Sequence, residues 1–234
     1  MKPRDGHFPR HGSRSRRRSV EERRSSVMTG KVMLRLLLVF ATFVIARPGT
    51  ASAQRYEDHT VLLLDRSASM ALPTTSGLTR FQLAVRRAQD IVAMGGSTPQ
   101  HYAVVSFNGT SYIVHLGFTT NTALIQFTLN SLKVGMESAP VAHAICGSVD
   151  ELLAYRPQVL AWKRIAFFSA SDGDTGTPPS SQCYGPPNTT PSPTPGSWQF
   201  KVRNKLVSGD PDNEGDPRSP LVQFSNVLLG GPFG

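Results

Sequence analysis

Asp65, Ser67 and Ser69 alternate directly after the apolar run of residues 61–64. Such a run has the composition of a strand buried on both faces, so the three side chains would follow the strand's carboxyl end. A carboxylate and two hydroxyls are the oxygen ligands that hard divalent cations such as Mg²⁺ prefer. The sequence therefore predicts a cation site here, provided that the intervening Arg66 faces away from it.

A second apolar run, residues 165–168, leads to Asp172 and Gly173. In open α/β sheets, ligands bind where the carboxyl ends of strands meet the following loops, so Asp172 would face the same hollow as Asp65. An Asp followed by Ser also commonly caps a turn, and one such motif alone carries little information. Two motifs in this order are more specific to a fold than to metal binding.

Apolar runs and amphipathic segments alternate through the rest of the chain. Thr79 and Gln82 form a capping-box pattern, and Gly95-Gly96 predicts the end of that helix. Asn108-Gly109 predicts a hairpin. The expected strands are 61–64, 102–107, 111–116, 165–168 and 221–229, and the expected helices are 79–94, 122–132, 141–155 and 198–207. This order predicts an α/β, Rossmann-like, doubly wound sheet, mostly parallel, with one antiparallel edge strand and helices on both faces.

Between about Thr60 and Gly230, these motifs and elements resemble the von Willebrand factor type A (vWA) domain. That family carries Asp-x-Ser-x-Ser after its first strand, a Thr in the middle and Asp-Gly after its fourth strand. The resemblance implies a metal-ion-dependent adhesion site (MIDAS) that holds Mg²⁺, or Mn²⁺ or Ca²⁺, through Asp65, Ser67, Ser69 and Asp172. In the family, a carboxylate from a protein partner fills an open coordination position, so we expect binding and no catalysis.

The chain departs from the family pattern in two places. Ala139 stands where the family has its Thr and offers no oxygen, while Ser138, one residue earlier, is a possible substitute. The family's last helix, expected after the final strand, also has no counterpart. Both departures favour an alternative, a structural or assembly domain whose metal site is degenerate. An enzyme is a third hypothesis, and Asp174 would be its only nearby general base.

The formal net charge of +9 is concentrated at the N-terminus. Residues 1–53 contain 12 Lys/Arg and 3 Asp/Glu, whereas residues 54–234 contain 13 of each. A nucleic-acid-binding domain needs a basic cluster of its own, and none is evident after residue 53. We therefore expect no nucleic-acid partner. The resemblance to the vWA family implies instead a protein or extracellular-matrix-type partner that offers a carboxylate.

Residues 31–53 have the pattern of a signal peptide. Lys31 and Arg35 precede the apolar stretch 36–46, and Ala51-Ser52-Ala53 forms an A-x-A cleavage site. The stretch is too short to span a bilayer, which takes about 20 residues. Residues 1–30 are then a basic extension, a long n-region, or the product of a misassigned start upstream of Met28 or Met33. We expect a secreted, periplasmic or extracellular protein with no membrane span after cleavage.

Residues 54–234 would form the vWA-like domain, with a Pro/Ser/Thr-rich loop at 175–196. The two cysteines, Cys146 and Cys183, suit an oxidising compartment and are candidates for a disulfide. The other possibility is two free thiols, one in a helix and one in a loop. His59, His115 and His143 lack the sequence spacing of metal ligands, so ordinary structural roles are expected for them.

Overall fold

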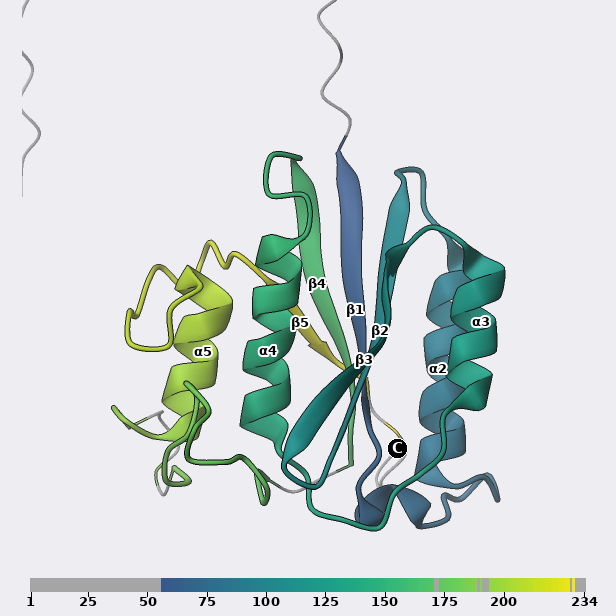
Figure 1. Ribbon diagram of the computed structural model, residues 1–234, viewed down its shortest axis with the longest axis horizontal. Helices are drawn as coiled ribbons and strands as arrows, with labels where there is room; N and C mark the ends of the chain where they lie inside the picture. The colour runs from purple at the N-terminus through teal and green to yellow at the C-terminus, as the bar shows by residue number, and fades with distance from the viewer. Residues whose placement is uncertain (1–55, 171–172, 189, 191–193, 228, 230–234) are drawn as a thin grey trace, which may run out of the picture. The chain divides into compact units, whose positions relative to one another are not determined.

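The computed structural model describes residues 56–170, 173–188, 190, 194–227 and 229 (Figure 1). They belong to the second of two compact units, Ala53–Gly234, and only this unit is treated below. The expected N-terminal extension, the signal peptide and Asp172 lie outside the described residues. Within the described part, no helix has the length and apolar character needed to cross a membrane.

A five-stranded sheet in the order β3-β2-β1-β4-β5 forms the centre of the unit. β1 pairs in parallel with β2 and β4, β4 pairs in parallel with β5, and β2 and β3 pair antiparallel. The predicted mostly parallel sheet with one antiparallel edge strand is therefore confirmed. The strands are β1 (Glu57–Asp65), β2 (Gln100–Asn108), β3 (Ser111–Thr119), β4 (Ala161–Phe168) and β5 (Gln223–Asn226).

Helices cover both faces of the sheet, α4 and α5 on one side and α2 and α3 on the other (Figure 1). Side chains alternate along a strand, so Val61 and Leu63 pack in the α4 core and Leu62 and Leu64 in the α2 core. This explains why residues 61–64 of β1 are apolar at every position. The helices are α2 (Arg80–Met94), α3 (Thr122–Ser131), α4 (Val141–Ala154) and α5 (Trp198–Ser208), with a short 3₁₀ turn η1 (Ala68–Ala71).

Local signals set most of the element boundaries. Thr79 and Gln82 form the predicted capping box at the start of α2, and Gly95 follows its end with φ +58°. The hairpin between β2 and β3 is also present, but its turn is displaced by one residue from the prediction. Asn108 pairs with Ser111, so the two turn residues are Gly109 and Thr110. Gly109 has φ +68°, a conformation that glycine adopts without steric cost.

The last strand is shorter than predicted because its first residues bond elsewhere. The backbone N–H groups of Leu221 and Val222 donate to the carbonyls of Val207 and Leu206 in the last turn of α5. These bonds satisfy helix carbonyls that have no partner within the helix. The pairing with β4 therefore begins at Gln223, and β5 covers Gln223–Asn226.

Candidate metal centre

Asp65 is the last residue of β1 and is completely buried. Its Oδ1 accepts a hydrogen bond of 2.7 Å from the Ser67 backbone N–H, and its Oδ2 accepts one of 2.6 Å from the Ser169 hydroxyl. Ser169 directly follows β4, which is the parallel neighbour of β1. The carboxyl ends of the two strands thus meet at one edge of the sheet, as the sequence predicts.

Ser67 and Ser69 lie in the turn that follows β1. Their hydroxyl oxygens are 3.1 Å apart, with Ser67 buried and Ser69 half-buried. Adjacent oxygens around an octahedral Mg²⁺, with bonds of 2.0–2.1 Å, stand about 3 Å apart. The two hydroxyls therefore have the spacing of neighbouring ligands, and Ser69 lies on a path to solvent.

Arg66 faces away from Asp65. Its Nε donates to the Lys133 carbonyl, and its Nη1 lies 3.4 Å from the Ser106 hydroxyl. Ser106 also bonds to the His115 imidazole at 2.8 Å. Burial lowers the pKa of His115, and the nearby Arg66 lowers it further. The arginine side chain is thus held over β2 and β3, away from the Asp65 carboxylate.

The loop before α4 provides no hydroxyl at the usual threonine position. Ala139 is 2% exposed and packs in the core beside α4. The hydroxyl of Ser138 donates a 2.8 Å hydrogen bond to the Gly109 carbonyl, so it is engaged with the β2–β3 hairpin. The same loop lies against the first motif, since the Ala68 N–H donates to the Glu137 carbonyl. The loop is therefore in place, but its ligand is missing.

Asp174 holds the hydroxyl of Thr177, and this threonine caps the start of α4. Its Oδ1 accepts from the Thr177 hydroxyl at 2.8 Å, and Thr177 Oγ1 accepts from the His143 N–H at 3.0 Å. Thr175 also exchanges two hydrogen bonds with the backbone of Ala139. The residue before α4, Pro140, has no side chain that can cap the helix. The loop after β4 supplies the cap instead, which explains Asp174 as a structural turn residue.

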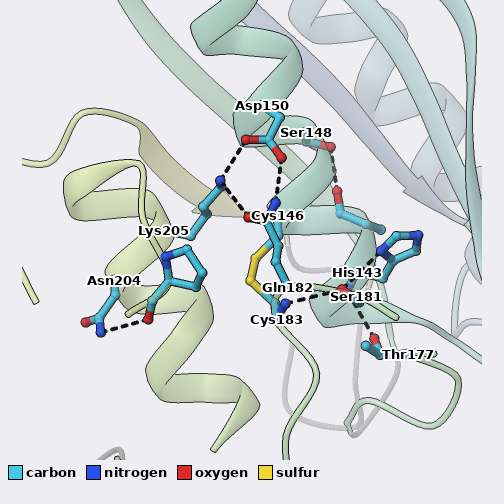
Figure 2. The surroundings of a disulfide bond; sticks show 12 residues. His143, Cys146, Ser148, Asp150, Thr177, Ser181, Gln182, Cys183, Asn204 and Lys205 are labelled. Atoms are coloured by element: carbon cyan, nitrogen blue, oxygen red, sulfur yellow. Dashed lines mark hydrogen bonds and ion pairs between the residues drawn. A yellow bond between two sulfur atoms is a disulfide. The ribbon is translucent and has the colours of Figure 1, made fainter. Parts of the chain in front are cut away.

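Cys146 of α4 and Cys183 of the long loop form a disulfide, with their Cα atoms 6.5 Å apart (Figure 2). Beside it, the buried Lys205 of α5 pairs with Asp150 at 2.7 Å and donates to Gln182 at 3.0 Å. Gln182 in turn donates to Asp150. The loop, α4 and α5 are thus joined by one covalent bond and one polar network.

The Asp65 side chain is held by hydrogen bonds and by no ion pair in the part of the chain that the structure describes. Among the described residues, Asp65 has no ion-pair partner, and its two hydrogen bonds come from neutral groups. A buried carboxylate is costly unless a cation or further hydrogen bonds compensate it. The residues Asp65, Ser67 and Ser69 therefore fit a hard divalent cation in charge, ligand type and spacing. Ser138 and Ala139 do not add to that fit.

The fold and the two motifs together define an α/β domain with a candidate ligand site at the carboxyl edge of its sheet. Residues 60–171 match the family model of the von Willebrand factor type A domain. This part of the chain is therefore a vWA domain, as the motifs predict. Among curated proteins, none matches the chain.

Several solved structures are similar to the chain at low identity. BatB from Bacteroides thetaiotaomicron is 18% identical over 47% of this chain and 52% of its own, with a TM-score of 0.41. The vWF domain of the type V pili tip protein Mfa5 from Porphyromonas gingivalis is 18% identical over 49% and 38%, with a TM-score of 0.39. Mussel byssus proximal thread matrix protein 1, solved with a zinc-occupied MIDAS motif, is 17% identical over 49% and 28%, with a TM-score of 0.38. The chain thus spans about half or less of each.

Proposed function

We propose that this chain is an exported binding module that recognises a protein or matrix ligand through a divalent cation, Mg²⁺ or else Mn²⁺ or Ca²⁺. The cation would be held by Asp65, Ser67, Ser69 and, beyond the described residues, Asp172. The observation that carries the proposal is the buried Asp65 carboxylate beside two hydroxyls that are 3.1 Å apart. No catalytic role is proposed, because Asp174 is engaged with Thr177 at the start of α4.

A cation at this position supplies a Lewis-acidic coordination site for a ligand carboxylate. The chain's own residues prepare that site. The Ser67 N–H and the Ser169 hydroxyl fix both oxygens of Asp65, and the bond from Ala68 to Glu137 holds the first turn against the loop before α4. Such prior ordering reduces the entropy lost when the partner binds.

Export rests on the signal-peptide pattern of residues 31–53 and agrees with the disulfide, which persists in oxidising compartments. A structural or assembly domain with a degenerate site is the second candidate. Ala139 favours it, since this residue is buried in the apolar core and leaves one ligand position without an oxygen. The two candidates differ in whether the domain binds a cation at Asp65.

Mn²⁺ binding to the full chain separates them. Loss of the free-Mn²⁺ electron paramagnetic resonance signal measures the affinity directly. Because Asp65→Asn keeps the shape of the side chain and removes its charge, we expect it to weaken Asp65-dependent binding by at least the roughly 10–100-fold that outer-shell changes cost. Asp90→Asn is the matched control, since Asp90 is exposed on α2, where it pairs with Arg87 at 4.0 Å.

The control variant should bind Mn²⁺ like the wild type. If Asp65→Asn also binds Mn²⁺ with unchanged affinity and stoichiometry, the cation-bridged function is wrong. The structural candidate is then favoured.

A further inference from the structure

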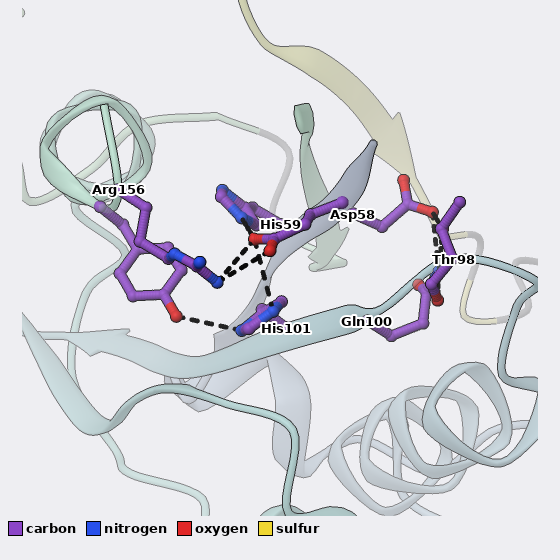
Figure 3. A network of polar contacts seen from close by, with 8 residues as sticks. Asp58, His59, Thr98, Gln100, His101 and Arg156 are labelled. Atoms are coloured by element: carbon purple, nitrogen blue, oxygen red, sulfur yellow. Dashed lines mark hydrogen bonds and ion pairs between the residues drawn. The ribbon is translucent and has the colours of Figure 1, made fainter. Parts of the chain in front are cut away.

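Three potential metal ligands meet at the opposite end of the sheet from Asp65. Glu57 and His59 are two residues apart on β1, so they point to the same face. His101 of β2 is the register partner of His59, which places the two imidazoles side by side (Figure 3). Along β1 this face continues into Val61 and Leu63, so the cluster lies on the side covered by α4.

The donor atoms have the separations that a small tetrahedral ion requires. Glu57 Oε2 lies 2.9 Å from His59 Nε2 and 3.5 Å from His101 Nε2. One ligand atom from each of the three residues lies within 4.8 Å of the other two. Zn²⁺ bonds of about 2.0–2.1 Å in tetrahedral geometry place ligand atoms roughly 3.3 Å apart. Two imidazoles and one carboxylate form a ligand set that Zn²⁺ accepts readily and Mg²⁺ does not favour.

The surroundings hold these side chains in place. His59 is completely buried, and its Nδ1 has no hydrogen-bond partner in the part of the chain that the structure describes. Tyr155 Oη bonds to His101 Nδ1 at 3.0 Å, which leaves His101 Nε2 directed toward Glu57. A hydrogen bond to the second ring nitrogen is the usual orienting contact of a metal-bound histidine. Tyr155 also lies edge-on to His59, and Phe118 stacks on Tyr155.

The guanidinium of Arg156 already pairs with Glu57 and supplies positive charge to this cluster. Its Nη1 lies 2.9 Å from Glu57 Oε1 and 2.8 Å from Oε2 (Figure 3). With φ +44°, Arg156 is the only non-glycine residue of the described chain with a positive φ. Arg156 follows Tyr155, the C-cap of α4, and helices commonly end in a left-handed residue at this position. The side chain is 43% exposed, so it can move aside and open a path from solvent.

We propose that Glu57, His59 and His101 form a second metal site, which binds Zn²⁺ through Glu57 Oε2 and the two imidazoles. Oε1 remains available to Arg156, and the fourth coordination position stays open. The site is independent of Asp65 and of the proposed adhesion function. The competing explanation is a purely structural network that joins the end of α4 to the sheet.

Zn²⁺ and Co²⁺ titrations of the untagged full chain test the proposal. A chromogenic chelator in competition reports the Zn²⁺ affinity, and the visible absorption of Co²⁺ reports tetrahedral coordination. We expect His101→Gln and Glu57→Gln each to weaken Zn²⁺ binding by at least the roughly 10–100-fold typical of outer-shell changes and to remove the tetrahedral Co²⁺ spectrum. His115→Gln removes a histidine that bonds to Ser106, away from Glu57, and should leave Zn²⁺ binding unchanged.

A gain of affinity provides an independent test that does not depend on how the ligand variants fold. Arg156→Asn removes the competing positive charge, and asparagine tolerates a positive φ. We expect this variant to bind Zn²⁺ roughly tenfold more tightly, because a nearby like charge opposes the metal. Arg87→Asn, on the exposed face of α2, should bind like the wild type. Absence of Zn²⁺ binding, or binding that neither His101→Gln nor Arg156→Asn alters, would overturn the proposal.

Discussion

Replacing both Cys146 and Cys183 with serine is expected to lower the free energy of unfolding by about 4 kcal/mol. The bond closes a loop between residues 37 apart in sequence, and loop-closure entropy in the unfolded chain gives this magnitude. The same loop carries Thr177, which caps the start of α4, and Gln182, which bonds to Asp150 and Lys205. Urea denaturation of the variant and the oxidised wild type measures the difference.

Reduced wild-type protein is the matched comparison for this variant. Both lack the cross-link, so their urea midpoints should agree and should lie below that of the oxidised protein. A loss smaller than about 1 kcal/mol would show that the unfolded chain gains little freedom when the bond is removed. The long loop would then be anchored mainly by its hydrogen bonds to α4.

Leu63→Ala is expected to destabilise the domain by about 2–5 kcal/mol. Leu63 is completely buried in the centre of β1, the middle strand of the sheet, and it packs in the core beneath α4. Its truncation removes apolar contacts and leaves a cavity that strands on both sides prevent from collapsing. The midpoint of thermal or urea unfolding provides the measurement.

Leu72→Ala is the control for this substitution. The same leucine-to-alanine change is made at Leu72, which directly follows η1 and whose side chain is 51% exposed. Exposed substitutions usually change stability by no more than about 0.5 kcal/mol. Equal losses from Leu63→Ala and Leu72→Ala would contradict the assignment of β1 as the buried centre of the sheet.

Much of the fold follows from local patterns in the sequence. The fully apolar run at 61–64 predicts a strand covered on both faces, and the structure has α4 on one side and α2 on the other. The capping box at Thr79 and the glycine after α2 mark both ends of that helix. The predicted fifth strand begins too early, because residues 221 and 222 bond to the last turn of α5. The hydrophobic pattern of the sequence does not indicate that contact.

The candidate sites were predicted less completely, because their parts come from distant segments. The roles of Ser169, Thr175 and Thr177 depend on where the loop after β4 returns to the chain, and single hydroxyl residues give no sequence signal. The sequence predicts an ordinary structural role for His59, because sequence spacing alone does not relate it to His101. The pair becomes visible only through the parallel register of β1 and β2. Glu57, two positions before His59, is the one local sequence feature that indicates this cluster.

Thermal unfolding of the full chain, first with EDTA and then with Mg²⁺ or Mn²⁺, tests the central claim most directly, with Asp65→Ala measured alongside. A ligand that binds only the folded state stabilises it, by about 2.7 kcal/mol at a concentration of 100 times the dissociation constant. The cation site at Asp65 predicts a metal-induced rise in melting temperature that Asp65→Ala abolishes. No shift at millimolar metal, or an equal shift in Asp65→Ala, would contradict cation-bridged recognition at this site.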